Sequence, residues 1–269
     1  MTPCMRMVAA VVAFAATSVA SAAAAVPDRQ PRLDPQTAIE QSRRAIGRTL
    51  GDYRLIDSRG AALPLRDYRG KPLVISLVYT ACSSVCPTST QHLLDAVAEA
   101  NRIFGSGSFN VLTVGFDTRN DTPGRLTQFA AAQGIRSPNW RLASGDGANI
   151  AALLGNLGFS YATIAGGFDH VTQTTIVDSE GKIYRHVYGD DFPLTMFIEP
   201  MKELIYGVTR PLSLGSLLDR IKFICTVYDP GAGRYRIDYG LTFGSVIAGV
   251  SLLVFGGLLY REWSRSGHA

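Results

Sequence analysis

Residues 72–87 read PLVISLVYTACSSVCP, and this stretch decides the fold. Residues 72–79 form a run dominated by β-branched, leucine and aromatic side chains, which is typical of a strand buried on both faces. Pro87 closes the stretch, and proline is favoured in the first turn of a helix. The stretch therefore predicts a buried strand that leads directly into a helix, with Cys82 and Cys86 at the turn between them.

A second strand and a second helix are expected to follow. The first helix, over residues 87–101, has apolar side chains at helical spacing: Leu93, Leu94, Val97 and Ala98. Residues 110–116, NVLTVGF, predict another buried strand. Asp121-Thr122-Pro123 predicts the cap of a helix over residues 123–133. The inward stripe of that helix is Leu126, Phe129 and Ala130.

Strands are also expected on both sides of this pattern. Residues 53–56 predict a short strand upstream. Residues 174–177 and 183–187 predict a hairpin, because the DSEG sequence between them has the composition of a turn. A last amphipathic helix is expected over residues 212–225. Together these elements predict an α/β fold with a mixed sheet flanked by helices, which is the layout of a thioredoxin-like domain.

The composition excludes several classes of protein. The chain has 269 residues, of which 46% are hydrophobic and 18% are charged, so it is too apolar to be disordered. Four cysteines are too few for a disulfide-built scaffold in a chain of this length. The net charge is +4 without a run of lysine or arginine, which gives no basic surface for nucleic acid.

The N-terminal residues 1–22 predict a cleaved export signal. A basic residue precedes an apolar run over residues 7–16, and Ala20-Ser21-Ala22 has the small residues of a signal-peptidase site. The alternative is an uncleaved anchor, but the apolar run is too short to span a bilayer. Cleavage would also remove Cys4. Residues 23–47 are expected to form a flexible leader.

The C-terminal region predicts a transmembrane helix over residues 239–260. Residues 241–259 contain no charged residue and are flanked by tyrosine, tryptophan and arginine. A buried core helix would show a polar face, which is missing here. With the export signal, this places a domain over residues 48–228 on the periplasmic side of the inner membrane. A juxtamembrane linker at 229–238 and a cytoplasmic tail at 261–269 complete the organisation.

Small residues recur at four-residue spacing in the predicted membrane helix. Gly240 pairs with Gly244, and Ser245 pairs with Gly249. Such spacing allows close helix packing and is compatible with a homodimer, although glycine-rich spans also produce it by chance.

Cys82 and Cys86 form the site that carries chemistry. If the helix begins near Ser83 or Ser84, its first amides stabilise a thiolate at Cys82 and make it a nucleophile or a soft-metal ligand. Two thiols one helical turn apart can hold a metal ion or close into a disulfide. A purely structural disulfide is the alternative in an exported protein, but so short a loop gains little stability from one.

A metal held by two thiols needs a further donor, and His170 is the best candidate. It lies in GGFDH at residues 166–170, which is expected to be a loop directly before a strand. A lone histidine is also common as a hydrogen-bonded surface residue, so both roles stay open from its position alone. His92 on the long helix, His186 on a hairpin strand and His268 in the tail are less suitable.

These motifs, in this order, resemble the Sco/SenC family of copper-binding proteins that assist cytochrome c oxidase assembly. They are the strand followed by CSSVCP, then Asp117 and Asp121-Thr122-Pro123, then Asp169-His170, and the VDSEGKI turn at 177–183. The resemblance covers residues 48–225. The membrane-proximal YDPG and GRY sequences are also similar to bacterial members with a C-terminal anchor.

The resemblance implies a thioredoxin-like domain in which Cys82, Cys86 and His170 bind copper. Thiolates suit Cu(I), and an added imidazole also tolerates Cu(II). Many family members carry Pro-Asp where this chain has Ser83-Ser84, so a carboxylate near the metal is missing here. The proposed ligands themselves are all present.

Two functions stay open at this point. As a metallochaperone, the chain would take copper from a donor protein and pass it to the copper-containing subunit of a cytochrome c oxidase. As a thiol-disulfide oxidoreductase, it would use Cys82 to attack a target disulfide and Cys86 to resolve it, keeping the oxidase cysteines reduced. The CxxxC spacing is longer than the CxxC of dedicated reductants and favours a metal.

Two further functions are less well supported. A peroxidase would need an arginine beside Thr80 and Cys82, and none is evident. A transmembrane sensor would need an output domain, for which the short tail leaves no room. Cys225 is expected to be buried or to pair with another chain.

Overall fold

The structure is a computed structural model that describes residues 32–207, 226–229, 234–237 and 239–266. Several predicted features lie outside these residues: the export signal at 1–22, the helix at 212–225, Cys4, Cys225 and His268.

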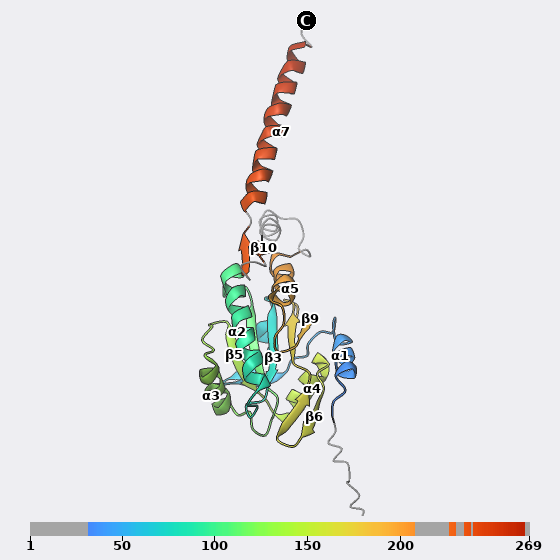
Figure 1. Ribbon diagram of the computed structural model, residues 1–269, viewed down its shortest axis with the longest axis vertical. Coiled ribbons are helices and arrows are strands. Elements are labelled where there is room, and N and C mark those ends of the chain that lie inside the picture. Colours follow the sequence, from blue (N-terminus) through green and yellow to red (C-terminus); the bar gives the residue numbers. More distant parts are fainter. Residues whose placement is uncertain (1–31, 208–225, 230–233, 238, 267–269) are drawn as a thin grey trace, which may run out of the picture. The chain divides into compact units, whose positions relative to one another are not determined.

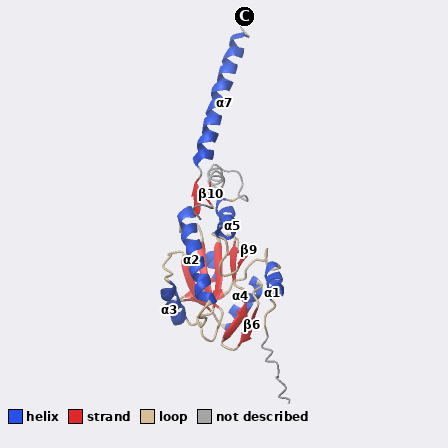
Figure 2. Cartoon of the chain, in the orientation of Figure 1, coloured by secondary structure: helices blue, strands red, loops and turns tan. Residues whose placement is uncertain are grey.

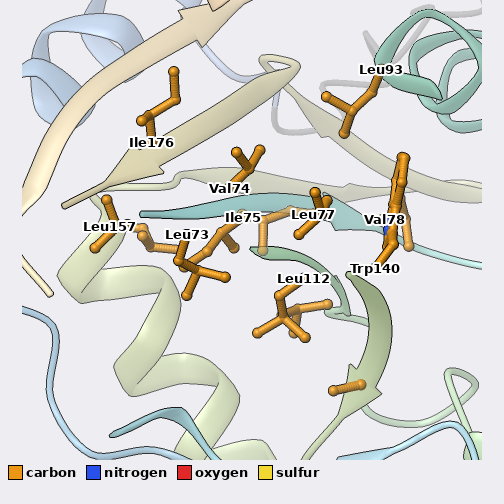
Figure 3. Packing of buried hydrophobic residues seen from close by; sticks show 14 of the residues in the cluster. Leu73, Val74, Ile75, Leu77, Val78, Leu93, Leu112, Trp140, Leu157 and Ile176 are labelled. Atoms are coloured by element: carbon orange, nitrogen blue, oxygen red, sulfur yellow. The ribbon is translucent and has the colours of Figure 1, made fainter. Parts of the chain in front are cut away.

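The apolar stretch at residues 72–79 forms strand β3 (Leu73–Val78), as predicted, and all its residues are buried. β3 runs parallel to β4 (Asn110–Gly115) and antiparallel to β8 (Gln173–Val177), so both of its backbone edges are hydrogen-bonded. Its side chains pack on both sides of the strand (Figure 3). Burial on both faces explains why the sequence here is apolar without alternation.

The other strands complete a mixed sheet of the order β2-β1-β5-β4-β3-β8-β9. β5 (Trp140–Ser144) is parallel to β4, and β1 (Arg54–Asp57) is antiparallel to β5. β2 (Ala62–Pro64) pairs with β1, and β9 (Ile183–Tyr188) pairs with β8 as the predicted hairpin. Helices flank the sheet (Figure 2). The predicted α/β class and mixed sheet are confirmed.

The two long predicted helices are also present. α2 (Val85–Phe104) begins within the two-cysteine motif, and its buried apolar stripe is Cys86, Leu93, Ala96, Val97 and Ala100. α3 (Pro123–Gln133) is capped by Thr122, whose hydroxyl accepts a hydrogen bond from the Arg125 amide. Ala98, predicted to face inward, is exposed, because the buried stripe of α2 runs through its neighbours Ala96 and Val97.

Several elements were not anticipated from the sequence. They are the strands β2 and β5, the short 3-10 helix η1 (Leu65–Tyr68), α4 (Gly147–Leu157), α5 (Leu194–Tyr206), and the hairpin of β6 (Tyr161–Ile164) with β7 (Gly167–His170). α5 packs against α2, where the rings of Phe104 and Tyr206 lie 5.5 Å apart. The chain order of these elements can be followed in Figure 1.

The expected flexible leader contains a helix, α1 (Pro35–Arg43), so this prediction needs correction for its second half. The Ser42 and Tyr188 hydroxyls lie 2.6 Å apart, which ties α1 to β9. The Leu33 amide donates to the Asp169 carboxylate at 3.1 Å, which ties the segment before α1 to β7. The sequence did not reveal this because α1 buries few residues, only Ala38 and Ser42.

The C-terminal residues form a hairpin and a long helix. β10 (Thr226–Asp229) pairs antiparallel with β11 (Arg234–Ile237), so the predicted linker at 229–238 includes a strand. α7 (Tyr239–Ser266) covers the segment predicted to cross the membrane. Within the described part of the chain, no helix has the combined length and apolarity required to cross a membrane. The transmembrane segment stays a prediction.

Candidate metal and redox site

The candidate site lies at the edge of the sheet where β3 and β4 end. Because these strands are parallel, the loops that follow them emerge at the same edge. The loop after β3 carries Cys82, and the loop after β4 carries Asp117 and Asp121. The sheet topology therefore brings together the two loops that carry the sequence motifs.

Cys82 and Cys86 are held together by the start of α2. Ser84 is the N-cap residue, but its side chain makes no capping hydrogen bond. Instead, the Cys86 amide donates to the Cys82 sulfur at 3.3 Å. The first amides of a helix lack partners within the helix, so a sulfur placed here replaces the missing cap and is stabilised as a thiolate. Both thiols are free.

The two thiols differ in their acidity. Burial raises the pKa of the Cys82 thiol, but hydrogen bonds from the Cys86 and Ser84 amides and from the Tyr79 hydroxyl outweigh it, and the net pKa shift is downward. Burial raises the pKa of Cys86 to about 12, and the negative charges of Cys82 and Asp121 add to this rise. Cys82 is therefore the accessible thiolate, and Cys86 is a buried, protonated thiol behind it.

Tyr79 at the end of β3 is a residue of the site that the sequence analysis missed. Its hydroxyl hydrogen-bonds to Cys82 and also contacts the backbone of Phe168 in β7. Gly167 makes room for this ring, because a Cβ atom there would lie 2.8 Å from the Tyr79 oxygen. Tyr79 thus joins the cysteine turn to the β6–β7 hairpin. Its position three residues before Cys82 was the available signal.

His170 ends β7, so residues 166–170 form part of a hairpin and not the expected loop. Its ring lies among aromatic rings, with centroid distances of 5.5 Å to Phe159, 5.6 Å to Phe116 and 6.0 Å to Tyr79. Burial lowers the pKa of His170, which favours the neutral imidazole. Its Nδ1 lies 3.3 Å from the Val171 carbonyl, which can only accept, so Nδ1 carries the proton and Nε2 keeps its lone pair.

The structure brings together Cys82 and Cys86 but does not complete a three-donor site. Among the described residues, no three histidine, cysteine, aspartate or glutamate side chains are gathered closely enough to hold a metal ion. Tyr79 contacts both residues, through its hydroxyl with Cys82 and through its ring with the ring of His170. The predicted histidine thus lies next to the cysteine turn, one side chain away.

Asp121 supports the cysteine turn from the second loop. Its carboxylate accepts hydrogen bonds from the Thr80 amide at 2.8 Å, the Thr80 hydroxyl at 2.7 Å and the Asp117 amide at 2.9 Å. A Cβ atom at Gly115 would lie 2.6 Å from the Asp121 Cβ, so only glycine admits this approach. Burial raises the pKa of Asp121 in spite of these donors. This buried carboxylate fixes the backbone two residues before Cys82.

The other described histidines have structural partners. The His92 Nε2 lies 2.7 Å from the Phe192 carbonyl. The His186 Nδ1 lies 3.0 Å from the Thr175 hydroxyl and 3.1 Å from the Gln173 amide nitrogen, within the buried side of β8 and β9. These contacts agree with the sequence-based preference for His170 as the donor.

Comparison with known proteins gives a family for this arrangement. The SCO1/SenC family model matches residues 41–205. A SCO2-like protein of Rickettsia felis is 26% identical over 152 residues, which are 53% of this chain and 71% of that protein.

Solved structures share the fold. A candidate electron transfer protein from Aquifex aeolicus VF5, known from a crystal structure, is 26% identical in sequence and matches with a TM-score of 0.56. The match covers 61% of this chain and 97% of the Aquifex chain. BsSco, described as a member of the Sco family of cytochrome c oxidase assembly proteins, is 20% identical with a TM-score of 0.51. It covers 59% of this chain and 94% of its own.

Proposed function

The chain belongs to the SCO1/SenC family, and from this premise we propose that it is a copper-binding protein that assists assembly of the copper site of a cytochrome c oxidase. The observation that carries the proposal is the thiol pair, in which the Cys86 amide holds the Cys82 sulfur at the start of α2. The family relationship supports the role in oxidase assembly, since BsSco is described in those terms.

The residues present fit a copper ion. Thiolates are soft donors and suit Cu(I), and Cys82 already favours the thiolate form. A metal ion bound at Cys82 would displace the proton of Cys86, as metal binding to thiols requires. His170 supplies a neutral imidazole whose Nδ1 hydrogen bond to Val171 leaves Nε2 for a metal. When bound, copper supplies the cargo that the oxidase site needs.

A closer approach of two segments is needed for all three donors to hold one ion. The β6–β7 hairpin carries His170, and Tyr79 contacts both His170 and Cys82. If the Tyr79 ring moved, the Nε2 atom of His170 could approach the sulfur atoms of Cys82 and Cys86. The aromatic rings around His170 exclude water from this region, which strengthens metal binding.

A thiol-disulfide oxidoreductase is the second candidate function, favoured by the acidity difference within the pair. Cys82 is the more acidic and more exposed thiol, as an attacking thiol should be. Cys86 is buried directly behind it and can resolve a mixed disulfide. Closing the Cys82 to Cys86 disulfide would remove both thiolates, so the same event would release copper.

We place the domain outside the cytoplasm, attached to the inner membrane through residues 239–260. The predicted export signal supports the location. The apolar side chains of α7 support the attachment, because Leu252 is 72% exposed and Leu253 is 78% exposed. Apolar side chains that are this exposed are unfavourable in water, and the hydrocarbon core of a bilayer would cover them.

The experiment uses the isolated copper domain of an oxidase subunit as acceptor, in two forms. One form has reduced cysteines without copper, and the other has its cysteines joined as a disulfide. A metallochaperone transfers copper from the loaded chain to the reduced acceptor and leaves the disulfide acceptor unchanged. An oxidoreductase, without copper, reduces the disulfide acceptor, and its Cys86→Ser variant accumulates a mixed disulfide with it. Failure of both reactions contradicts the proposed function.

A further inference from the structure

A cleft of about 360 Å³ opens beside Cys82. One wall is the start of α2, with Cys82 and Pro87. The other wall is α3, with Arg125, Gln128 and Gln133. The cleft therefore places the accessible thiol at the side of a groove between two helices.

The α3 wall is formed by one face of the helix. Arg125, Phe129 and Gln133 are spaced four residues apart, and Gln128 lies three residues after Arg125, so these side chains lie on one face of the helix. Phe129 is buried and forms an apolar base. At the far end, the Gln91 side chain donates to the Gln133 carbonyl at 2.9 Å and to its side-chain oxygen at 2.8 Å. This contact joins α2 to α3 and closes the groove.

The positive charge of the cleft comes from Arg125 on the α3 wall, and the Cys82 thiolate lies on the other wall. The Arg125 guanidinium has no carboxylate within ion-pair distance among the residues that the structure describes, although other exposed arginines such as Arg66 and Arg102 are paired. The remaining polar groups on this face are amides, which donate and accept hydrogen bonds but carry no charge. A carboxylate on a ligand that lies along the α3 wall can therefore pair with Arg125.

We infer that this cleft docks an extended, cysteine-bearing peptide segment with a carboxylate side chain next to its cysteine. The volume admits about three residues, on the basis of ordinary side-chain sizes. The glutamine amides would meet the peptide backbone, and Arg125 would bind the carboxylate. The inference rests on the proposed function, because the docked segment is the partner that exchanges thiols or copper with Cys82.

The chemistry of the docked state is thiol exchange. The Cys82 thiolate attacks the peptide sulfur of a mixed disulfide, the Cys82-to-peptide disulfide bond forms, and the old disulfide bond breaks. The leaving thiolate takes the electron pair and then a proton from water. No other oxidant or reductant is needed, because Cys82 is oxidised to a disulfide while the leaving sulfur is reduced to a thiolate.

The test measures this step with two short peptides that differ at one position. Each carries a cysteine joined by a disulfide to pyridine-2-thiol, followed by glutamate in one peptide and glutamine in the other. The full-length reduced chain is mixed with each, and release of the coloured pyridinethione is recorded. Release that persists in the Cys82→Ser variant is subtracted, because it comes from other thiols.

We expect the glutamate peptide to react about threefold to fivefold faster, as one solvent-exposed ion pair allows. Arg125→Ala should abolish this preference, Arg125→Glu should invert it, and high salt should weaken it. Arg136→Ala is the matched control, since it removes the same charge from an exposed site that does not line the cleft, and it should keep the preference.

Two results would overturn the inference. They are equal rates for both peptides in the parent chain, or a preference that survives in Arg125→Ala. Copper binding is measured in parallel for each variant. A chain that binds copper but shows no charge preference contradicts only the docking inference, whereas a parent chain that binds no copper contradicts the proposed function.

Discussion

The backbone amide of Cys86 donates a hydrogen bond to the sulfur of Cys82 at 3.3 Å. Through this contact the first turn of α2 both positions the two thiols and makes them unequal. The Cys82 sulfur accepts from the Cys86 amide in the first turn of the helix, and the Cys86 side chain lies on the buried face of α2, 2% exposed. The pair thus combines a reactive thiolate at Cys82 with a buried, protonated thiol at Cys86.

This inequality predicts selective alkylation. At neutral pH, iodoacetamide should modify Cys82 at least about tenfold faster than Cys86, because only the thiolate reacts and Cys86 is buried with a raised pKa. Mass spectrometry of the digested chain after timed quenching measures both sites. Comparable rates at the two cysteines would show that the helix start does not distinguish them.

The Tyr79 hydroxyl is predicted to hold Cys82 as a thiolate. Tyr79→Phe removes the hydrogen bond to the sulfur, so the pKa of Cys82 should rise and its alkylation at neutral pH should slow several-fold. Tyr68→Phe is the matched control. The Tyr68 hydroxyl is buried and has no hydrogen-bond partner among the described residues, so its loss should leave the rate unchanged. Equal rates for parent and Tyr79→Phe would remove Tyr79 from the site.

Gly167 is predicted to be required for the packing of Tyr79. In Gly167→Ala the new Cβ would lie 2.8 Å from the Tyr79 oxygen and 3.1 Å from Cε2, so the ring or the hairpin must shift. We expect a loss of about 1–3 kcal/mol in the free energy of unfolding, measured by denaturant titration. Gly124→Ala, in open space on α3, should be neutral or stabilising by up to about 1 kcal/mol. Equal stabilities of the two variants would contradict the packing argument.

The central part of the fold is predictable from the sequence because its physical signals are local. β3 and β4 are buried on both faces and read as apolar runs, and α3 begins at Thr122 followed by proline. The hairpin of β8 and β9 follows from the turn composition between them.

The missed elements lack such local signals. The strands β6 and β7 contain no fully buried residue, and neither YATI nor GFDH alternates apolar and polar residues as a surface strand would. α5 contains Pro200 within the helix, and an internal proline argues against predicting a helix from the sequence. The helix forms nevertheless and packs against α2. These segments depend on contacts with residues far away in the sequence.

The site, like the fold, was predictable only where its signals are local in the sequence. The cysteine pair follows from spacing and from the expected helix start, and the structure confirms that the two lie in contact. His170 as a ligand stays a prediction, because the described residues do not gather it with the two thiols closely enough to hold a metal ion. The contact of Tyr79 with Cys82 spans only three residues, whereas its contact with β7 joins segments far apart in the sequence and could not be predicted locally.

His186 predicts a pH dependence of stability. Burial lowers the pKa of His186 from 6.5 to about 4, so between these values the unfolded chain binds a proton that the folded chain does not. The contribution of neutral His186 to the free energy of unfolding is therefore fully present above pH 6.5 and is lost as the pH drops toward 4. The loss should reach about 3 kcal/mol at most.

Denaturant titrations at a series of pH values measure this loss. The His186→Gln variant cannot take up that proton, so its stability should vary less over the same range, whatever its absolute value. If the free energy of unfolding changes as steeply with pH in His186→Gln as in the parent chain, His186 does not cause the pH dependence of stability.

The most direct test of the central claim is copper binding by the reduced, full-length chain, measured without oxygen against a chromophoric Cu(I) chelator. We predict one copper ion per chain, loss of binding in Cys82→Ser, and at least about tenfold weaker binding in His170→Ala. His92→Ala should bind like the parent, because the His92 Nε2 contacts the Phe192 carbonyl. A parent chain without copper would contradict the account, and a His170→Ala variant that binds as tightly as the parent would remove His170 from the ligands.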